Sequence, residues 1–185
     1  MELKQVIFLG LTLGFIPVAA WLGIRYRWVE RALVAGALFS TCYLIDINFV
    51  SMELYRGDTK GFVFGVTDWM IITLMIIMAR APRWKKKRPE LLPPNSTLML
   101  AYLMLAVLTI FVAYVPVYAG FGVFKLMRAM AVYWGAYNYL RSEEDLRFFV
   151  MVLAAMVGLQ FLLVMQDRLS GIYRAKGSTP HSNTL

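Results

Sequence analysis

The sequence predicts an all-α, polytopic integral membrane protein with about six transmembrane helices in a single membrane domain. Three observations predict this fold class. Of the 185 residues, 60% are hydrophobic and only 16% are charged, whereas soluble domains average about 25% charged residues. Apolar runs of the length needed to cross a bilayer, about 20 residues, recur along the whole chain. The Lys and Arg residues cluster between these runs, a pattern typical of membrane orientation rather than of nucleic-acid binding.

Six apolar segments are expected to be the membrane-spanning helices. Their expected ranges are 5–24, 32–50, 61–79, 97–119, 121–140 and 148–166. The polar stretch 25–31 separates the first two segments, and a basic loop with several prolines follows the third. The fourth segment lies in the longest uncharged run of the chain. Ser142-Glu-Glu-Asp145 is a capping-box pattern that places acids at the positive end of the sixth helix.

The orientation follows from the basic loop at 80–90, which carries six Lys and Arg residues against one acid, Glu90. Short loops rich in Lys and Arg stay on the cytoplasmic side, so this loop is expected in the cytoplasm. Alternation then places 25–31 and 141–147 on the same side, and places the N-terminus and 167–185 outside. A first segment that enters the membrane without crossing it would instead leave the N-terminus inside.

Metal and disulfide chemistry are not expected. The chain contains one cysteine and one histidine, which excludes an internal disulfide and a Cys/His metal cluster drawn from this chain alone. We therefore expect no metal and no cofactor.

Basic residues on the expected outer side are the candidate ligand-binding groups. Lys125 and Arg128 lie one helical turn apart, and Arg168, Arg174 and Lys176 follow the sixth segment. One interpretation is that these side chains snorkel to lipid headgroups. The other is an anion site, because cations on this side oppose the usual charge bias of membrane proteins.

The C-terminal segment 171–185 is polar and contains a turn prescribed by Gly177 and Pro180. His181 and Asn183 add hydrogen-bonding groups beside it. The segment is either a frayed polar tail or part of a pocket for a phosphate-bearing or sugar-bearing ligand.

Two carboxylates, Asp46 and Asp68, lie within the expected second and third segments. An intramembrane carboxylate usually has a partner, and Lys125 or Arg128 could supply it. Both acids are then structural counter-ions. The alternative role is ion coupling in a small transporter.

Several stretches resemble one protein family. The match is strongest from the fifth segment onward, at Arg128, Tyr137-Asn-Tyr-Leu-Arg141, Glu144-Asp-Leu-Arg147 and Arg174-x-x-Gly177-x-x-Pro-His181-Ser-Asn183. These stretches resemble the N-terminal half of the O-antigen ligase and polymerase family, the polytopic bacterial glycosyltransferases of surface-polysaccharide assembly. The family often carries Arg-x-x-Gly followed by a His-Pro-Asn-like turn, and Ser182 stands here in the place of that proline.

The resemblance implies a metal-independent transfer of glycan from a polyprenyl-pyrophosphate donor to a sugar hydroxyl, on the outer face of the bacterial inner membrane. The implied partners are the lipid-linked oligosaccharide donor, a glycan or lipid acceptor, and membrane lipids, with no nucleic acid. Lys125, Arg128 and Arg174 would hold the pyrophosphate, since such catalysis needs preorganised cations. The catalytic residue is not assigned.

Family members usually have ten or more spans, so the resemblance implies that the chain is the N-terminal part of a longer protein and inactive alone. The alternatives from other classes are a small ion-coupled transporter and a non-catalytic membrane subunit.

Overall fold

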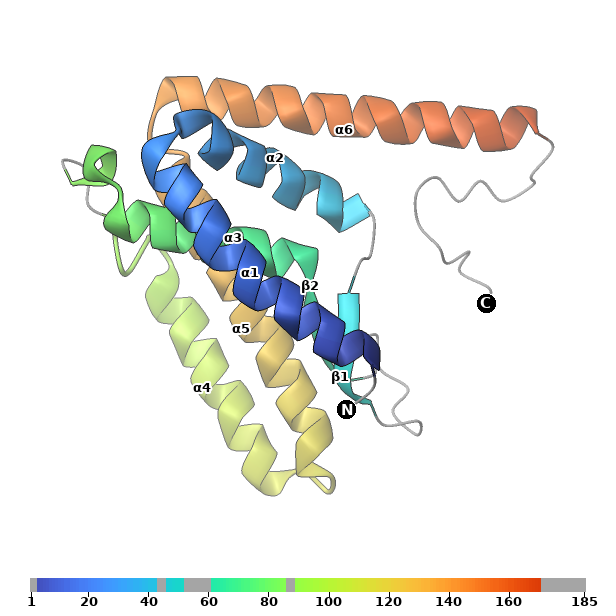
Figure 1. Cartoon of the computed structure of the whole chain (residues 1–185). Coiled ribbons are helices and arrows are strands. Elements are labelled where there is room, and N and C mark those ends of the chain that lie inside the picture. Colours follow the sequence, from blue (N-terminus) through green and yellow to red (C-terminus); the bar gives the residue numbers. More distant parts are fainter. Residues whose placement is uncertain (1–2, 43–45, 52–60, 86–88, 171–185) are drawn as a thin grey trace.

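The chain is mostly helical. The computed structural model describes residues 3–42, 46–51, 61–85 and 89–170 (Figure 1). Within these ranges there are six α-helices, one short 3-10 helix and a two-stranded sheet. In chain order the elements are α1 (Leu3–Arg25), α2 (Arg27–Cys42), β1 (Asp46–Ser51), β2 (Gly61–Gly65), α3 (Val66–Arg80), η1 (Pro82–Trp84), α4 (Ser96–Val112), α5 (Pro116–Tyr139) and α6 (Glu143–Leu169).

The core lies around α3, which packs against α1, α2 and α5. Leu74, Ile77 and Met78 of α3 are at most 3% exposed. The helices α1 and α2 form a hairpin with Tyr26 alone between them. Gly23 lets the end of α1 approach α3 closely, because a Cβ at this position would lie 2.2 Å from Ile77 Cδ1. The central helix α3 is therefore the element against which α1, α2 and α5 are placed.

A β-hairpin replaces part of two expected helices, so the ranges 32–50 and 61–79 are wrong as continuous helices. The helix α2 ends at Cys42, and the next described residues form β1, which pairs antiparallel with β2. The residues of β2 alternate between buried and half-buried, the period of two that a strand imposes. β-Branched and aromatic residues in both strands favour this conformation, whereas apolarity averaged over 20 residues does not distinguish it from a helix.

The remaining helix boundaries differ from the expected ones by a few residues. The fourth segment, expected to reach residue 119, ends at Val112, and α5 begins at Pro116 rather than at 121. Proline is favoured in the first turn of a helix, where its missing N–H costs nothing. The sixth helix begins at Glu143, before the apolar span expected from 148, and this start agrees with the capping pattern, because the Ser142 side chain accepts a hydrogen bond from the Asp145 N–H. Apolarity marks the lipid-compatible stretch and not the helix ends.

Two of the described helices, α1 and α6, are long and apolar enough to cross a membrane. The helices α2, α3 and α4 have 16, 15 and 17 residues, which gives them lengths of about 23 to 26 Å, short of a core of about 30 Å. Figure 1 shows α6 lying along α2 and across the direction of α4 and α5, with its last turns projecting beyond the other helices. About six transmembrane helices were expected, and two of the described helices meet the length and apolarity of a span.

The close contact between strands β1 and β2 can be tested by a substitution at Gly61. A Cβ at Gly61 would lie 1.6 Å from the backbone oxygen of Val50, so Gly61→Ala must push the strands apart. We expect it to lower the free energy of unfolding by about 1–3 kcal/mol, the usual cost of overpacking. The matched control is Gly14→Ala in α1, where a Cβ meets nothing within 4 Å. Denaturant titration in detergent micelles measures both; equal effects would contradict the described pairing.

Candidate functional site

A buried ion pair joins α3 to α5. Asp68 is 8% exposed, and its two carboxylate oxygens accept from Arg128, with Nε to Oδ1 at 2.8 Å and Nη2 to Oδ2 at 2.8 Å. The second oxygen also accepts from the Gly65 N–H at 2.7 Å. This bidentate geometry is the strong form of an Arg–carboxylate pair. Of the two cations considered as partners of Asp68, the structure thus places Arg128 against it.

A groove of about 430 Å³ lies along the junction of α4 and α5, which also pack against each other. The side chains that line it are mostly small or apolar. Among these described residues, Lys125 is the charged one. The lining residues are Tyr102, Ala106 and Thr109 from α4, and Ala119, Gly122, Val123, Lys125, Leu126 and Ala129 from α5. A volume of this size falls within the range of small-molecule sites.

Lys125 and Arg128 therefore face different neighbours, although their spacing predicts one face. Lys125 lines the groove beside α4, whereas Arg128 is bound to Asp68 on α3. Apart from Lys125, the residues that line the groove were not predicted from the sequence. The signal that could have found them is the set of small residues on α5, Ala119, Gly122 and Ala129, because small side chains leave room between neighbouring helices.

Of the other predicted site residues, the structure describes Arg168 and the backbone of Asp46, and neither is among the residues that line the groove. Arg168 lies in the last turn of α6, and these last turns project away from α4 and α5 in Figure 1. Arg174, Lys176, His181 and Asn183 lie outside the described residues. Asp46 begins β1 opposite Gly65, and its side chain is also outside the described part of the structure.

At the opposite end of α5, three junctions are tied together by ion pairs. Arg27 in α2 lies 3.0 Å from Asp145 at the start of α6, and Arg31 pairs with Glu144. Arg83 of η1 donates from Nε to Glu30 at 2.8 Å, and also to the last carbonyls of α1 at Gly23 and Ile24. The three loops that the sequence predicts on one side of the membrane thus meet at one end.

Two of these groups carry shifted pKa values, and both lie outside the apolar stretches of their helices. The hydrogen bond to Asp145 raises the pKa of Arg27 above its ordinary value. The hydrogen bond from Arg31 lowers the pKa of the Glu144 carboxyl, with Arg27 adding to the effect. Both shifts favour the charged forms, so these ion pairs persist at neutral pH.

The basic loop is held to α5 through Glu90 and Asn138. The Asn138 side chain is 0% exposed; its Oδ1 accepts from the Glu90 N–H at 2.7 Å, and its Nδ2 donates to the Glu90 carbonyl at 3.1 Å. Arg141 adds an ion pair to the Glu90 carboxylate at 2.9 Å. The end of the loop is therefore fixed to α5 through both backbone groups and the carboxylate of Glu90.

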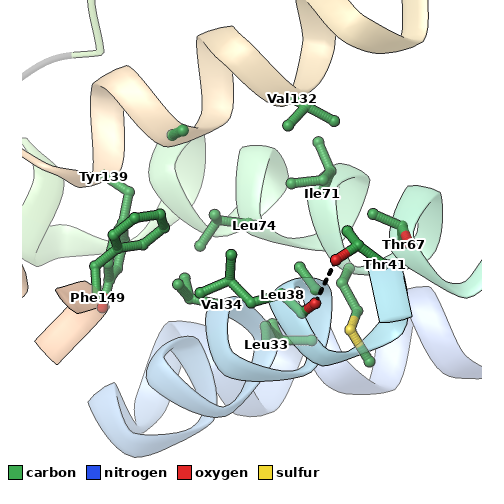
Figure 2. A pocket seen from close by; sticks show the side chains of 13 residues that line it. Leu33, Val34, Leu38, Thr41, Thr67, Ile71, Leu74, Val132, Tyr139 and Phe149 are labelled. Carbon is green, nitrogen blue, oxygen red and sulfur yellow. Dashed lines mark hydrogen bonds between the residues drawn. The ribbon is translucent and has the colours of Figure 1, made fainter. Parts of the chain in front are cut away.

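A second, apolar cavity of about 130 Å³ lies between α2, α3 and α5, with Phe149 of α6 at its edge (Figure 2). Leu33, Val34, Ile71 and Leu74 line it. The Thr41 hydroxyl is engaged with the Leu38 carbonyl at 2.7 Å, the dashed line in Figure 2. Such a space accepts hydrocarbon and offers no reactive group.

Comparison with protein-family models, with curated proteins and with solved structures gives no match for this chain.

Proposed function

We propose that the chain is the N-terminal part of a membrane glycosyltransferase of the O-antigen ligase and polymerase type. In this proposal the groove between α4 and α5 takes part of the polyprenyl chain of a polyprenyl-pyrophosphate donor, and Lys125 contacts the pyrophosphate. The observation that carries the proposal is a lysine in a groove whose other walls are mostly small and apolar. The proposed donor matches this arrangement, because it combines a long hydrocarbon chain with a compact anionic pyrophosphate.

The surroundings of the groove support a ligand that arrives from the bilayer. The outer face of α4 exposes large apolar side chains, including Leu98, Leu105 and Phe111. A helix face with several exposed large apolar side chains is typical of a surface that contacts lipid or a partner protein. A polyprenyl chain could then enter the groove sideways without passing through water.

The position of Lys125 suits the expected outer side. It lies 14 residues before Tyr139, which is about 21 Å along α5 from the end where the ion pairs gather. If that end faces the cytoplasm, the lysine reaches the outer half of the membrane. Glycan transfer joins the sugar to an acceptor hydroxyl, which loses its proton, and breaks the bond between the sugar and the pyrophosphate. A cation beside the donor stabilises the charge that develops on the departing pyrophosphate.

Arg128 takes a positioning role in this proposal. Its guanidinium binds Asp68 through two nitrogens, which fixes α5 against α3 and so holds the wall of the groove. The same pairing disfavours the transporter alternative, because both carboxylate oxygens of Asp68 are already engaged by Arg128 and the Gly65 N–H. The non-catalytic membrane subunit is the alternative that the next experiment tests.

Binding of a short polyprenyl pyrophosphate to the chain in nanodiscs tests the assignment. We expect Lys125→Ala to weaken binding about ten- to hundredfold, since a charge-assisted hydrogen bond contributes about 1.5–3 kcal/mol. Lys125→Arg should keep most of the affinity. Gly122→Leu should block the groove without straining the fold, because a Cβ there meets nothing within 4 Å.

The control for these variants is Arg147→Ala, which removes an exposed cation at the other end of the molecule. If all of these variants bind as the wild type does, the groove is not the donor site. Loss of ion-dependent uptake in Asp68→Asn would instead favour the transporter.

A further inference from the structure

The apolar cavity between α2, α3 and α5 is separate from the donor groove proposed above, because the two spaces have no lining residue in common. Figure 2 shows Tyr139 and Phe149 at one end of the cavity and Thr41 and Thr67 at the other. Its volume is about 130 Å³, and an engineered apolar cavity of about 150 Å³ binds benzene. The cavity therefore has room for a short piece of hydrocarbon.

Water is a poor occupant of this cavity. A buried water needs about two to four polar partners, and the threonine hydroxyls at the wall are already engaged. The Thr41 hydroxyl donates to the Leu38 carbonyl at 2.7 Å, and the hydroxyls of Thr67 and Ser40 bind each other at 2.7 Å. The Tyr139 hydroxyl is enclosed by protein atoms and has almost no accessible surface. The lining therefore offers an occupant mainly apolar contacts.

The cavity extends from buried side chains to the molecular surface. Leu33 and Leu74 in its wall are 5% and 3% exposed, whereas Val132 of α5, which also lines it, is 40% exposed. On α6, Leu153 follows Phe149 by one helical turn and is 38% exposed. An occupant that enters beside Val132 or Phe149 thus passes over apolar side chains.

The surface beside the cavity belongs in part to a helix that is suited to a bilayer. Helix α6, which contributes Phe149 to the lining, is long and apolar enough to cross a membrane, and little of its apolar stretch is buried inside the molecule. Exposed apolar surface of this kind contacts lipid chains. An empty apolar cavity also forfeits dispersion contacts, which the end of such a chain restores.

We infer that the cavity binds the end of an acyl chain of a membrane phospholipid. The chain end fits because it brings apolar atoms and needs no hydrogen-bond partner, and because the bilayer supplies it at the surface where the cavity opens. This inference needs the membrane but not the transferase activity.

Photolabelling from the acyl chain tests the inference. The full chain is reconstituted in nanodiscs of phosphatidylcholine that carries a photoreactive diazirine on the last carbons of one acyl chain. We expect labels on the cavity walls, within 33–41 of α2 and 67–74 of α3, in addition to labels on the exposed side chains of α6. The same lipid with the diazirine beside the ester group should label these walls much less, because the chain end is the part that enters.

Two substitutions fill the cavity from different helices. Ala136→Leu on α5 and Ala37→Leu on α2 each add apolar volume to the lining, so the wall labels should be lost while the labels on α6 stay. Ala154→Leu makes the same change at an exposed position of α6 and should keep the wall labels. In micelles without lipid, Tm of the two filling variants should not fall, since the added side chains occupy empty space.

Three results would overturn the inference. The first is a wild-type chain without labels at 33–41 and 67–74, because the cavity would then hold no chain end. The second is equal labelling of these walls by the two lipids, which would show general contact with the bilayer. The third is wild-type labelling of the walls in both filling variants, because the label would then come from outside the cavity. The Tm values and the labels on α6 show whether each variant is folded.

Discussion

Replacing Arg128 with methionine lowers the free energy of unfolding by about 3–5 kcal/mol. The change leaves the Asp68 carboxylate, which is 8% exposed, without the guanidinium that binds both of its oxygens. Removing one partner of a buried pair is costly because the other charge stays desolvated. Denaturant titration in micelles, followed by circular dichroism, measures the effect.

A matched control distinguishes the effect of burying the ion pair from the effect of removing a positive charge on the free energy of unfolding. Arg147→Met also removes an arginine from an ion pair, but Arg147 and its partner Glu143 are 76% and 78% exposed, so the expected change is within about 0.5 kcal/mol. Adding Asp68→Asn to the Arg128→Met variant should recover much of the loss, since no bare charge then remains. Equal, small effects of the two arginine substitutions would contradict the buried pair.

Replacing Asn138 with alanine is expected to cost about 2–4 kcal/mol. The side chain is 0% exposed and binds both backbone groups of Glu90, so the substitution leaves one donor and one acceptor unpaired at about 1–3 kcal/mol each. The basic loop should also loosen, because Asn138 fixes it to α5. Denaturant titration and the rate of tryptic cleavage after Lys85 measure the two effects.

The neighbouring residue supplies the control for this variant. Tyr137→Phe removes a hydroxyl that lies 3.3 Å from the Glu90 carboxylate at the surface, so its cost should stay below about 1 kcal/mol. Tryptic cleavage of Asn138→Ala at the wild-type rate would show that the loop is held by other contacts.

Composition and apolar runs were sufficient to predict a helical chain with apolar helices at α1 and α6. They did not predict the β-hairpin, because a window of 20 residues averages over strand and helix alike. Strand pairing depends on which residues meet in space, as at Gly61 beside Val50. The capping pattern at Ser142 did predict where α6 begins, before the apolar stretch does.

The candidate site was only partly predictable, because it too depends on which residues meet in space. Because an intramembrane carboxylate usually has a partner, Arg128 was one of two cations expected to pair with Asp68. The spacing of the two cations alone could not distinguish between them. The sequence analysis placed Arg27, Arg31 and Arg83 on the same side of the membrane. Their acidic partners are 53 to 118 positions away in the sequence. Such pairs form only through tertiary packing. The groove was missed because the sequence does not show that the small residues of α5 face α4.

The most direct test of the proposed function is photolabelling of the wild-type chain in nanodiscs. A polyprenyl pyrophosphate that carries a photoreactive group near its head is cross-linked, and the labelled peptides are mapped by mass spectrometry. The proposal predicts labels on both walls of the groove, within 102–109 of α4 and 119–129 of α5, reduced when unlabelled donor competes. Labels spread over α1 and α6, or a polyprenol without pyrophosphate that labels the groove equally well, would contradict it.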